Sequence, residues 1–392
     1  MREEQQLKTF KRILEAYTND TPLSKFLPSF FKKNKQMGAN DRRIASKLIY
    51  NYFRLGLALA NLAIEDRLFI AMFLCNIVSD PFLNYFRPGL DEKISHTVKD
   101  KIAFLESEYG FKTEDVFPFV DHFSAGIDAL KFSHSFFSQP DLYIRIHPGK
   151  EKLVKTVLEE AAVQYQELNK LTLALPNGTK LDSIFSDFDS GVIKTPPFEI
   201  QDLSSQQTLA FYKPNRYESW WDACAASGGK SLLLFSQEPD IKLVVSDIRE
   251  SVLNNLDERF IRAGLRTYQK KLLDLTKNAD PELHSYSFDG IILDAPCSGS
   301  GTWGRTPEMI SQFEEYKIKG FHNLQKSIAC NVIKYLKPGK PLIYITCSVF
   351  KEENEDVVNY LVSKLNMKLE AIEVLKGYEY KADTMFVARL IK

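Results

Sequence analysis

The pattern of apolar and polar positions changes twice along this chain of 392 residues. Up to about residue 135, apolar residues recur at spacings of three and four, as in residues 41–54, and this spacing predicts helices without strands. Beyond it, residues 142–147 alternate like a strand and residues 148–162 have the pattern of a helix. A further strand pattern, 171–175, ends in a Pro-Asn-Gly turn. The sequence therefore predicts a helical bundle followed by a small α+β segment.

From about residue 217 to the end, apolar runs alternate with helical patterns, which is typical of a parallel, doubly wound sheet. We expect strands at 219–223, 241–246, 268–273, 288–294 and 341–346. We expect helices at 229–237, 249–263, 307–336 (as two helices) and 351–365. The tail would add two strands, 368–374 and 385–391, as an antiparallel edge hairpin. The fold class predicted is thus α/β.

Composition adds few constraints. Hydrophobic residues make up 44% of the chain and charged residues 26%, as in ordinary globular proteins. No apolar run reaches the roughly 18 residues that a membrane span needs, and the charged first residues read as a helix rather than a signal peptide. Five cysteines without a C-x-x-C spacing argue against a disulfide framework and a zinc site. We expect a cytoplasmic, monomeric protein without metal or membrane contact.

Charge is balanced over the whole chain but not locally. The formal net charge is zero, which argues mildly against a nucleic-acid partner. Residues 32–54 nevertheless carry one acid, Asp41, and seven basic residues, namely Lys32, Lys33, Lys35, Arg42, Arg43, Lys47 and Arg54. This segment is either a solvated helix face or a surface that binds RNA phosphates.

Two cysteines fifty positions apart, Cys297 and Cys347, each follow an apolar run that reads as a buried strand. In an open α/β sheet, ligands bind beyond the carboxyl ends of the strands. Two thiols at two such ends can therefore face one ligand. A thiol beside a ligand serves as a nucleophile or a base.

The first turn from strand to helix, residues 222–231, reads Asp-Ala-Cys-Ala-Ala-Ser-Gly-Gly-Lys-Ser. Glycines at a helix start let backbone N–H groups approach a ligand closely. The turn nearly matches the phosphate loop, but Cys224 stands where that loop has its first glycine. The next three strands each end near an acid, in order Asp247, Asp274 and Asp294. Such acids repel a triphosphate but suit the cationic sulfonium of S-adenosylmethionine, which favours this cofactor over ATP.

A thiol pair beside such a cofactor suits methyl transfer to carbon 5 of a pyrimidine. That carbon is a poor nucleophile, and addition of a thiolate to carbon 6 makes it reactive enough to attack the sulfonium methyl. The site must favour the thiolate, because a thiol with a pKa of about 8.5 is only a few per cent ionised at neutral pH.

Three motifs carry a family resemblance: Asp222-x-Cys-Ala-Ala-Ser-Gly-Gly-Lys, Asp294-Ala-Pro-Cys-Ser-Gly-Ser-Gly-Thr and Thr346-Cys-Ser. In this order they resemble the Sun/Fmu family of RNA cytosine-5 methyltransferases, which use S-adenosylmethionine. The resemblance implies a Rossmann-like class I methyltransferase domain in which Cys347 is the nucleophile and Cys297 helps to release the product. It places Asp294 against nitrogen 3 of the cytosine and Lys230 near the reacting centre.

The same resemblance implies a set of cofactor-binding residues: Cys224, Ala225, Ala226, Ser227, Gly228, Gly229, Lys230, Asp247, Asp274 and Asp294. One departure is visible, because the family usually has proline where Ser227 stands. Serine leaves the backbone donors of the turn intact but makes it less rigid. We therefore expect altered cofactor affinity rather than lost function.

The pattern within 41–54 is similar to the NusB-like helical domain of the Fmu-type enzyme, which methylates small-subunit ribosomal RNA. We predict a helical RNA-binding domain at 1–135, a small α+β RNA-binding subdomain at 136–215 and a catalytic domain at 216–392. Ribosomal RNA is the first candidate substrate and transfer RNA the second. Two alternatives stay open: an RNA-binding ribosome assembly factor that keeps the fold without catalysis, and a nucleotide hydrolase built on the near-phosphate loop.

Overall fold

A computed structural model describes residues 2–186 and 197–392, and residues 187–196 of the predicted 136–215 subdomain lie outside the described residues. The chain divides into two compact units. The helical unit comprises Met1–Asp121, Asp128–Gln139 and Thr302–Glu315, and the sheet unit comprises His122–Ile127, Pro140–Gly301 and Tyr316–Lys392. The three functional domains expected from the sequence stay a prediction.

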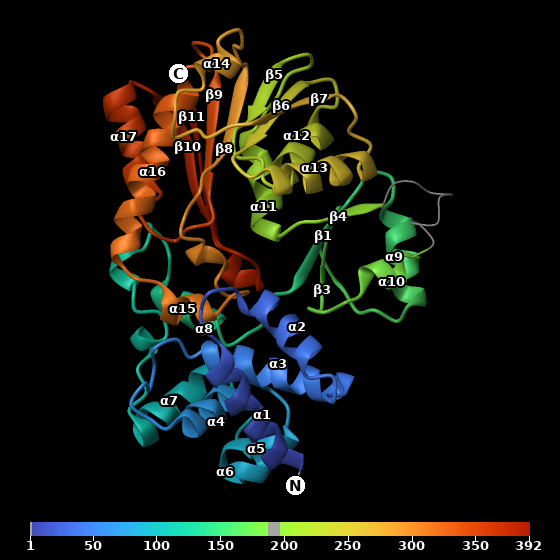
Figure 1. Ribbon diagram of the computed structural model, residues 1–392, viewed down its shortest axis with the longest axis vertical. Helices are drawn as coiled ribbons and strands as arrows, with labels where there is room; N and C mark the ends of the chain where they lie inside the picture. Colours follow the sequence, from blue (N-terminus) through green and yellow to red (C-terminus); the bar gives the residue numbers. More distant parts are fainter. Residues whose placement is uncertain (1, 187–196) are drawn as a thin grey trace. The chain divides into compact units, whose positions relative to one another are not determined.

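The helical unit is built around one apolar helix, α4 (Ile64–Cys75), whose residues Leu68 to Leu74 are all buried. Besides α4, the unit contains α1 (Arg2–Ala16), α2 (Leu23–Lys33), α3 (Ala39–Phe53), α5 (Pro81–Phe86), α6 (Pro88–Asp91), α7 (Val98–Tyr109) and α8 (Ala129–Ser135), in blue to cyan in Figure 1. Helices α3, α5 and α7 pack directly against α4. The amphipathic helices of the unit bury one apolar side, which is the origin of the three-and-four spacing in the sequence.

A segment from the C-terminal half of the sequence completes the helical unit. The two helices predicted within 307–336 are confirmed, but the sequence did not indicate that the first of them lies outside the sheet unit. That helix, α15 (Glu308–Gln312), belongs to the helical unit together with Trp303. The Trp303 ring lies 5.6 Å from that of Phe117, and the Glu308 carboxylate accepts a hydrogen bond from the backbone N–H of Leu23 at 3.0 Å. Burial of these side chains among the aromatic residues of the helical unit explains the placement.

The sheet unit contains a seven-stranded sheet in the order β10-β11-β9-β8-β5-β6-β7 (Figure 1). Its strands are β5 (Ser219–Asp222), β6 (Lys242–Asp247), β7 (Tyr268–Leu272), β8 (Gly290–Asp294), β9 (Pro341–Thr346), β10 (Lys368–Leu375) and β11 (Met385–Ile391). Strands β5 to β9 pair in parallel, and β11 pairs antiparallel with both β9 and β10. The predicted class I methyltransferase fold is confirmed, including the antiparallel hairpin. After β5 the chain adds β6 and β7 on one side of it and then β8 and β9 on the other. The order of strands therefore switches between β5 and β8, and a ligand crevice is expected at their carboxyl ends.

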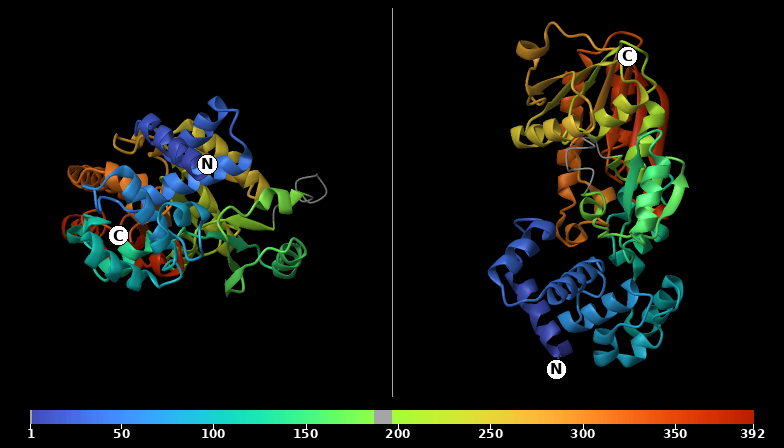
Figure 2. Two further views of the ribbon diagram at one scale, coloured as in Figure 1. Left: turned by 90° about the horizontal axis from the view of Figure 1, so that it is seen from below. Right: turned by 90° about the vertical axis from the view of Figure 1, so that its right-hand side faces the viewer.

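Helices cover both faces of this sheet, so its central strands β6, β8 and β9 are largely apolar on both sides, whereas β7 and β10 near its edges carry exposed polar residues. Trp221, Leu293 and Tyr344 pack on the face of α16 (Tyr316–Ile333) and α17 (Glu355–Leu365). Their sequence neighbours Trp220, Ile292 and Ile343 pack on the face of α12 (Gly229–Gln237) and α13 (Glu250–Arg262). The views in Figures 1 and 2 show the two helical layers on either side of the strands. A short helix, α14 (Asp280–Leu283), precedes β8.

A second, four-stranded sheet of the same unit has the order β2-β3-β1-β4, with antiparallel pairs throughout. Strands β1 (Leu142–Ile146) and β3 (Thr172–Leu175) and helix α9 (Glu151–Glu160) confirm the sequence prediction. Three short elements were not expected: strands β2 (Gln166–Asn169) and β4 (Phe198–Ile200) and helix α10 (Leu181–Ile184). Helix α11 (Leu203–Gln207) then leads to β5.

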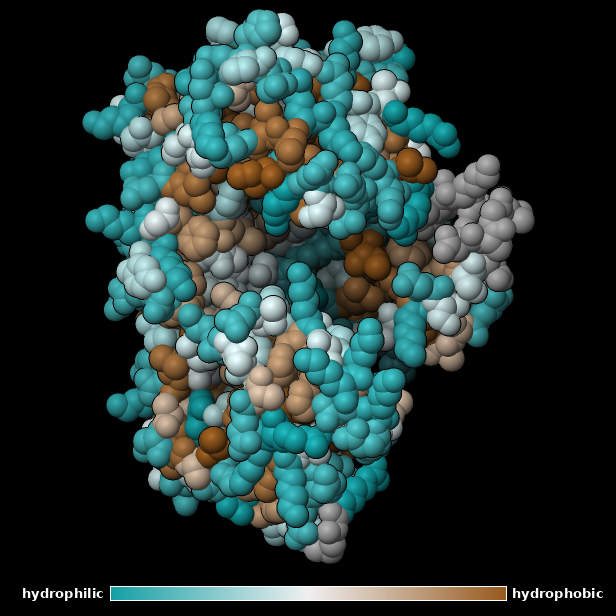
Figure 3. All heavy atoms as spheres, in the orientation of Figure 1, coloured by the Kyte–Doolittle hydropathy of each residue, from teal (hydrophilic) through white to brown (hydrophobic). Residues whose placement is uncertain are grey.

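The face of the molecule in Figure 3 is largely hydrophilic, with small brown groups of apolar side chains between charged ones. Within the described parts of the chain, no helix is both long and apolar enough to cross a membrane.

Candidate active site

The turn after β5 places a row of backbone groups at the start of α12. Gly228 precedes the helix with φ +81°, and a Cβ atom there would lie 2.3 Å from Cε1 of Phe260, so only glycine is accommodated. Ala226 also has a positive φ, +46°. The Ala225 amide donates to the carbonyl of Ser246 at 2.8 Å, which ties the turn to β6. The buried Cys224 thiol has a pKa raised by burial, and its sulfur takes no part in the turn's hydrogen bonds.

Asp247 ends β6 beside this turn. Its Oδ2 accepts a hydrogen bond from the Ala226 amide at 3.1 Å, and its Oδ1 accepts from the amide and Nε of Arg249, each at 3.0 Å. Burial alone would raise the pKa of Asp247, but these hydrogen bonds hold it below its ordinary value. Asp247 is therefore an ionised acceptor 5% exposed at the edge of the sheet.

Asp274 follows β7 in a tight turn rather than at the strand's last residue. It accepts hydrogen bonds from the amide and hydroxyl of Thr276, at 3.1 and 2.6 Å, and these lower its pKa. Its carboxylate is more exposed than that of Asp247 and also lies 3.2 Å from Nζ of Lys277. The structure thus places both acids beyond the carboxyl ends of adjacent strands.

Lys230, in the first turn of α12, links the carboxyl end of β5 to that of β8, the two strands between which the strand order switches. Its Nζ lies 3.2 Å from Oδ2 of Asp294, the last residue of β8, and donates to the hydroxyl of Ser205 at 2.9 Å. Lys230 is 8% exposed. This ion pair brings together two residues that the sequence resemblance assigned to the reacting centre.

The two cysteines meet in space. The Sγ atoms of Cys297 and Cys347 lie 3.3 Å apart, and both are free thiols, half-buried at the ends of adjacent parallel strands β8 and β9. The hydrogen bond to Cys347, and then burial, raise the pKa of Cys297 well above its usual value. Cys297 therefore keeps its proton and can donate it in a hydrogen bond to the Cys347 sulfur.

Residues 209–391 match the family model described as 16S rRNA methyltransferase RsmB/F. We refer to the segment that matches this model as the RsmB/F domain. The matched segment begins in the residues just ahead of β5 and includes the glycine turn, Asp294 and both cysteines.

Curated relatives of the RsmB/F domain are ribosomal RNA small subunit methyltransferases B. The protein of Shewanella oneidensis is 30% identical over 242 residues, which cover 57% of this chain and 56% of that protein. The protein of Pasteurella multocida is 28% identical over 260 residues, covering 62% of this chain and 56% of that protein. The chain thus spans little more than half the length of these relatives.

Solved structures share the fold of the chain. The crystal structure of PH0851 has a TM-score of 0.69 at 21% identity and covers 97% of this chain and 96% of that one. NSun6 from Pyrococcus horikoshii, solved with SFG, has a TM-score of 0.57 at 18% identity and covers 67% of this chain and 94% of that one.

The basic segment lies in the helical unit and not in the RsmB/F domain. Lys32, Lys33, Lys35, Arg43 and Lys47 are exposed, and Arg42 is partly exposed. Arg54 is different, because it is buried and its Nη1 donates to the carbonyl of Phe136 at 2.8 Å. Arg54 therefore belongs to the core of the helical unit.

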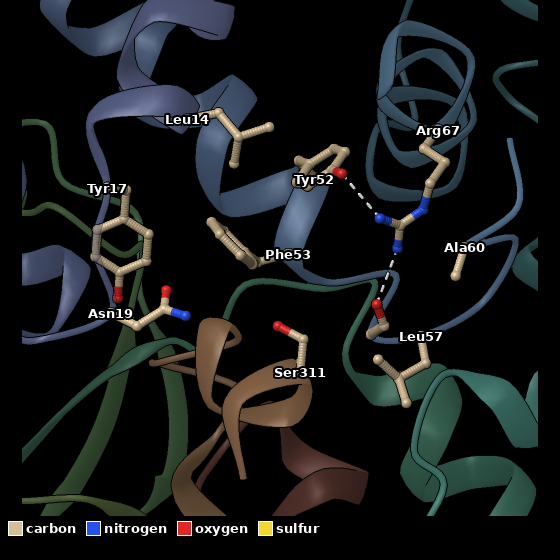
Figure 4. Close-up of a pocket in the computed structure, with 10 residues that line it drawn as sticks. Leu14, Tyr17, Asn19, Tyr52, Phe53, Leu57, Ala60, Arg67 and Ser311 are labelled. Carbon is tan, nitrogen blue, oxygen red and sulfur yellow. Dashed lines mark hydrogen bonds between the residues drawn. The ribbon is translucent and has the colours of Figure 1, made fainter. Parts of the chain in front are cut away.

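A pocket lies near this segment in the helical unit (Figure 4). Its lining includes the rings of Tyr17, Tyr52 and Phe53. The Arg67 guanidinium is fixed there, since it donates to the Tyr52 hydroxyl at 2.8 Å and to the Gly56 carbonyl at 2.9 Å.

Three residues around the RsmB/F site were not identified from the sequence. Ser205 holds Lys230, Arg259 on α13 donates to the Ser227 hydroxyl at 3.3 Å, and the buried Glu353 contacts both cysteine loops. Ser205 lies in the segment Gln-Asp-Leu-Ser-Ser-Gln, residues 201–206, shortly before β5, and this polar segment is a signal that could have identified it. Arg259 and Glu353 lie among ordinary charged helix and loop residues, so no local signal identifies them.

Proposed function

We propose that this protein transfers a methyl group from S-adenosylmethionine to carbon 5 of a cytosine in RNA, through a covalent adduct on Cys347. The observation that carries the proposal is the pair of free thiols 3.3 Å apart at the ends of β8 and β9. A single thiol at this position would have the ordinary role of a core side chain. Two adjacent thiols supply both an attacking sulfur and a partner that stabilises it. Membership of residues 209–391 in a methyltransferase family counts against the nucleotide hydrolase.

The residues beyond β5 and β6 suit S-adenosylmethionine. Two observations support the fit: the glycine turn has no space for a Cβ at Gly228, and Asp247 is an ionised, nearly buried acceptor of hydroxyl hydrogen bonds. Asp247 would hold the ribose, the backbone from Cys224 to Lys230 would hold the amino-acid part, and Asp274 would lie near the base. The bound cofactor supplies an electrophilic methyl group on a sulfonium.

Lys230 and Asp294 would orient the cytosine. The ammonium group 3.2 Å from the Asp294 carboxylate fixes the direction of the carboxylate, and the Ser205 hydroxyl fixes the ammonium. Asp294 is then held for pairing at the nitrogen 3 edge of the ring. Positioning of this kind lowers the barrier because the reacting groups meet in a productive orientation.

The thiols divide the covalent work. Cys347 adds to carbon 6, which makes carbon 5 nucleophilic. After methyl transfer a base takes the carbon 5 proton, the double bond between carbons 5 and 6 re-forms, and the electron pair of the carbon 6–sulfur bond returns to the Cys347 sulfur. Cys297 keeps its proton beside that sulfur, because the hydrogen bond with Cys347 and burial raise the pKa of the Cys297 thiol. Its S–H would stabilise the Cys347 thiolate before attack and again as the leaving group.

Ribosomal RNA of the small subunit is the proposed substrate, because the family model and the curated relatives carry that description. The exposed cations of α2, α3 and the turn between them would contact phosphates; they are Lys32, Lys33, Lys35, Arg43 and Lys47. Transfer RNA is the second candidate.

The test is methylation of unmodified 16S ribosomal RNA and of transfer RNA by the purified protein, with cofactor labelled in the methyl group. We expect label in ribosomal RNA and a new bisulfite-resistant cytosine, both absent with Cys347→Ala. The contrary result is a protein that binds RNA and cofactor but transfers no label to transfer RNA, to free ribosomal RNA or to ribosomal RNA within small subunits. That result would support the non-catalytic assembly factor.

A further inference from the structure

One buried carboxylate holds both cysteine loops. Glu353 is 0% exposed, and its Oε2 accepts a hydrogen bond from the backbone N–H of Ser298 at 2.8 Å. Its Oε1 accepts from the Ser348 hydroxyl at 3.0 Å. Ser298 directly follows Cys297 and Ser348 directly follows Cys347, so the contacts lie one residue beyond each thiol.

A cluster of three buried hydroxyls strengthens this connection. The Oγ atoms of Ser298, Ser300 and Ser348 lie 3.1 to 3.2 Å from one another. The backbone N–H of Val349 donates to Ser300, and that of Phe350 donates to Ser348. These side chains therefore join the loop after β8 to the loop after β9, in addition to the backbone hydrogen bond from the N–H of Gly301 to the carbonyl of Cys347 at 2.9 Å.

Two further contacts fix Glu353 itself. Gln325 on α16 donates from Nε2 to Oε2 of Glu353 at 3.2 Å and to the carbonyl of Pro296 at 3.0 Å. The Tyr344 hydroxyl, on β9, donates to the backbone carbonyl of Glu353 at 2.6 Å. Glu353 is thus anchored to a helix and a strand as well as to the two loops.

A carboxylate is an expensive group to bury, because it gives up its hydration and needs hydrogen bonds in return. Burial raises the pKa of Glu353, while its bonds to Ser298, Ser348 and Gln325 oppose that rise. An apolar side chain of the same size could not accept the hydrogen bonds that Glu353 receives at this position. The task of the buried carboxylate here is to accept hydrogen bonds from two loops at once.

We propose that Glu353 is a positioning residue for the thiol pair: by binding the residue after each cysteine, it sets the distance between the two sulfur atoms. The spacing matters when the bond between Cys347 and carbon 6 breaks and the electron pair returns to sulfur, because Cys297 must then be within hydrogen-bond reach. The catalytic consequence rests on the proposed function, whereas the spacing of the sulfurs does not.

The sulfur spacing can be measured without RNA or cofactor. Phenylarsine oxide condenses with two neighbouring thiols, forming two sulfur–arsenic bonds and releasing one water, and intact mass follows the reaction. We expect Glu353→Gln to slow this capture about tenfold, because an amide offers one acceptor oxygen where the carboxylate offers two. Cys297→Ala gives the background rate. The matched control is Glu352→Gln, one residue away, whose carboxylate binds His122 instead.

Methylation kinetics supply the second readout. Glu353→Gln should lower kcat by about 100-fold while leaving the KM for cofactor within about twofold, since the cofactor turn does not contact Glu353. Ser348→Ala removes one of the two loop contacts and should change both readouts in the same direction but less. It also serves if Glu353→Gln does not fold. Capture at the wild-type rate in a folded Glu353→Gln protein, or in Ser348→Ala, would overturn the proposal. If the wild-type protein shows no methylation activity but Glu353→Gln still slows capture, the positioning role of Glu353 stands and the proposed function is rejected.

Discussion

The guanidinium of Arg259 lies 3.3 Å from the hydroxyl of Ser227, in the turn where the family pattern has proline. The same guanidinium is paired with Glu199 of β4 at 2.9 Å and donates to the Ile200 carbonyl. Ser227 is thus held from outside by a side chain that is itself fixed to the small sheet. The hydrogen bond supplies part of the rigidity that a proline ring would give.

A double-mutant cycle tests this relationship. Ser227→Ala and Arg259→Ala should each weaken binding of S-adenosylhomocysteine, and the two effects should couple by about 0.5–1.5 kcal/mol. Titration calorimetry gives the four affinities. Arg262→Ala, one turn away and paired with Glu258, is the control and should leave affinity unchanged. Strictly additive effects would mean that the hydrogen bond does not support the turn.

The thiols should behave differently when removed. Cys347→Ala should abolish turnover and form no bond to RNA, because nothing remains to add to carbon 6. Cys297→Ala should accumulate a protein–RNA complex that survives denaturing electrophoresis, because the departing Cys347 thiolate loses its hydrogen-bond donor. RNA with 5-fluorocytosine should trap the wild type as well. A complex in Cys347→Ala but not in Cys297→Ala would reverse the two roles.

Removal of the Asp247 carboxylate should weaken cofactor binding. Asp247→Ala should cost about 1–3 kcal/mol, the typical loss when hydroxyls lose a charged acceptor. Asp240→Ala removes an exposed acid whose side chain pairs with Arg216, away from the cofactor turn, and it should leave the affinity unchanged. Calorimetry with S-adenosylhomocysteine measures both. Equal affinities for the two variants would remove Asp247 from the site.

The exposed cations of the helical unit should govern the salt dependence of RNA binding. Neutralisation of Lys32, Lys35 and Arg43 should flatten the log–log slope by roughly 0.7–0.9 for each RNA phosphate that these side chains neutralise in the wild type. The control neutralises Lys334, Lys364 and Lys368, which are exposed on the sheet unit, and so changes net charge equally. If both triple variants bind with the wild-type slope, the exposed cations within residues 32–54 are solvated and do not contact RNA.

Asp222 should make stability depend on pH. Burial raises the pKa of Asp222 from 3.8 to about 7, although the Ser231 hydroxyl donates to it at 2.6 Å. Between these values the native protein holds a proton that the unfolded chain has released, so this group's contribution to stability falls as pH rises. In urea unfolding, the free energy of unfolding of Asp222→Asn minus that of the wild type should therefore be larger at pH 8 than at pH 5. The same relative stability at both values would contradict the raised pKa.

Much of the fold follows from local sequence. Strands β5 to β9 were predicted within two residues at each end. For β6, β8 and β9 the reason is that burial on both faces makes the strand a mostly continuous apolar run bounded by polar turns. The glycine turn, the acids beyond β6 to β8 and the two cysteines were likewise visible, since chemistry beyond a parallel strand depends on where the strand ends. The roles of these residues stay predictions.

Tertiary packing decided the rest. Only the fold reveals that α15 lies in the helical unit, that Arg54 is buried rather than exposed, and that Arg259 reaches Ser227. Glu353 looks like any acid in the run Lys-Glu-Glu-Asn-Glu, yet it is buried between two loops while Glu352 beside it binds His122. The sequence by itself determined which residues end the strands, because that depends on neighbours along the chain. Which polar side chains are taken out of water depends on segments tens to hundreds of residues away, and only the tertiary structure brings those together.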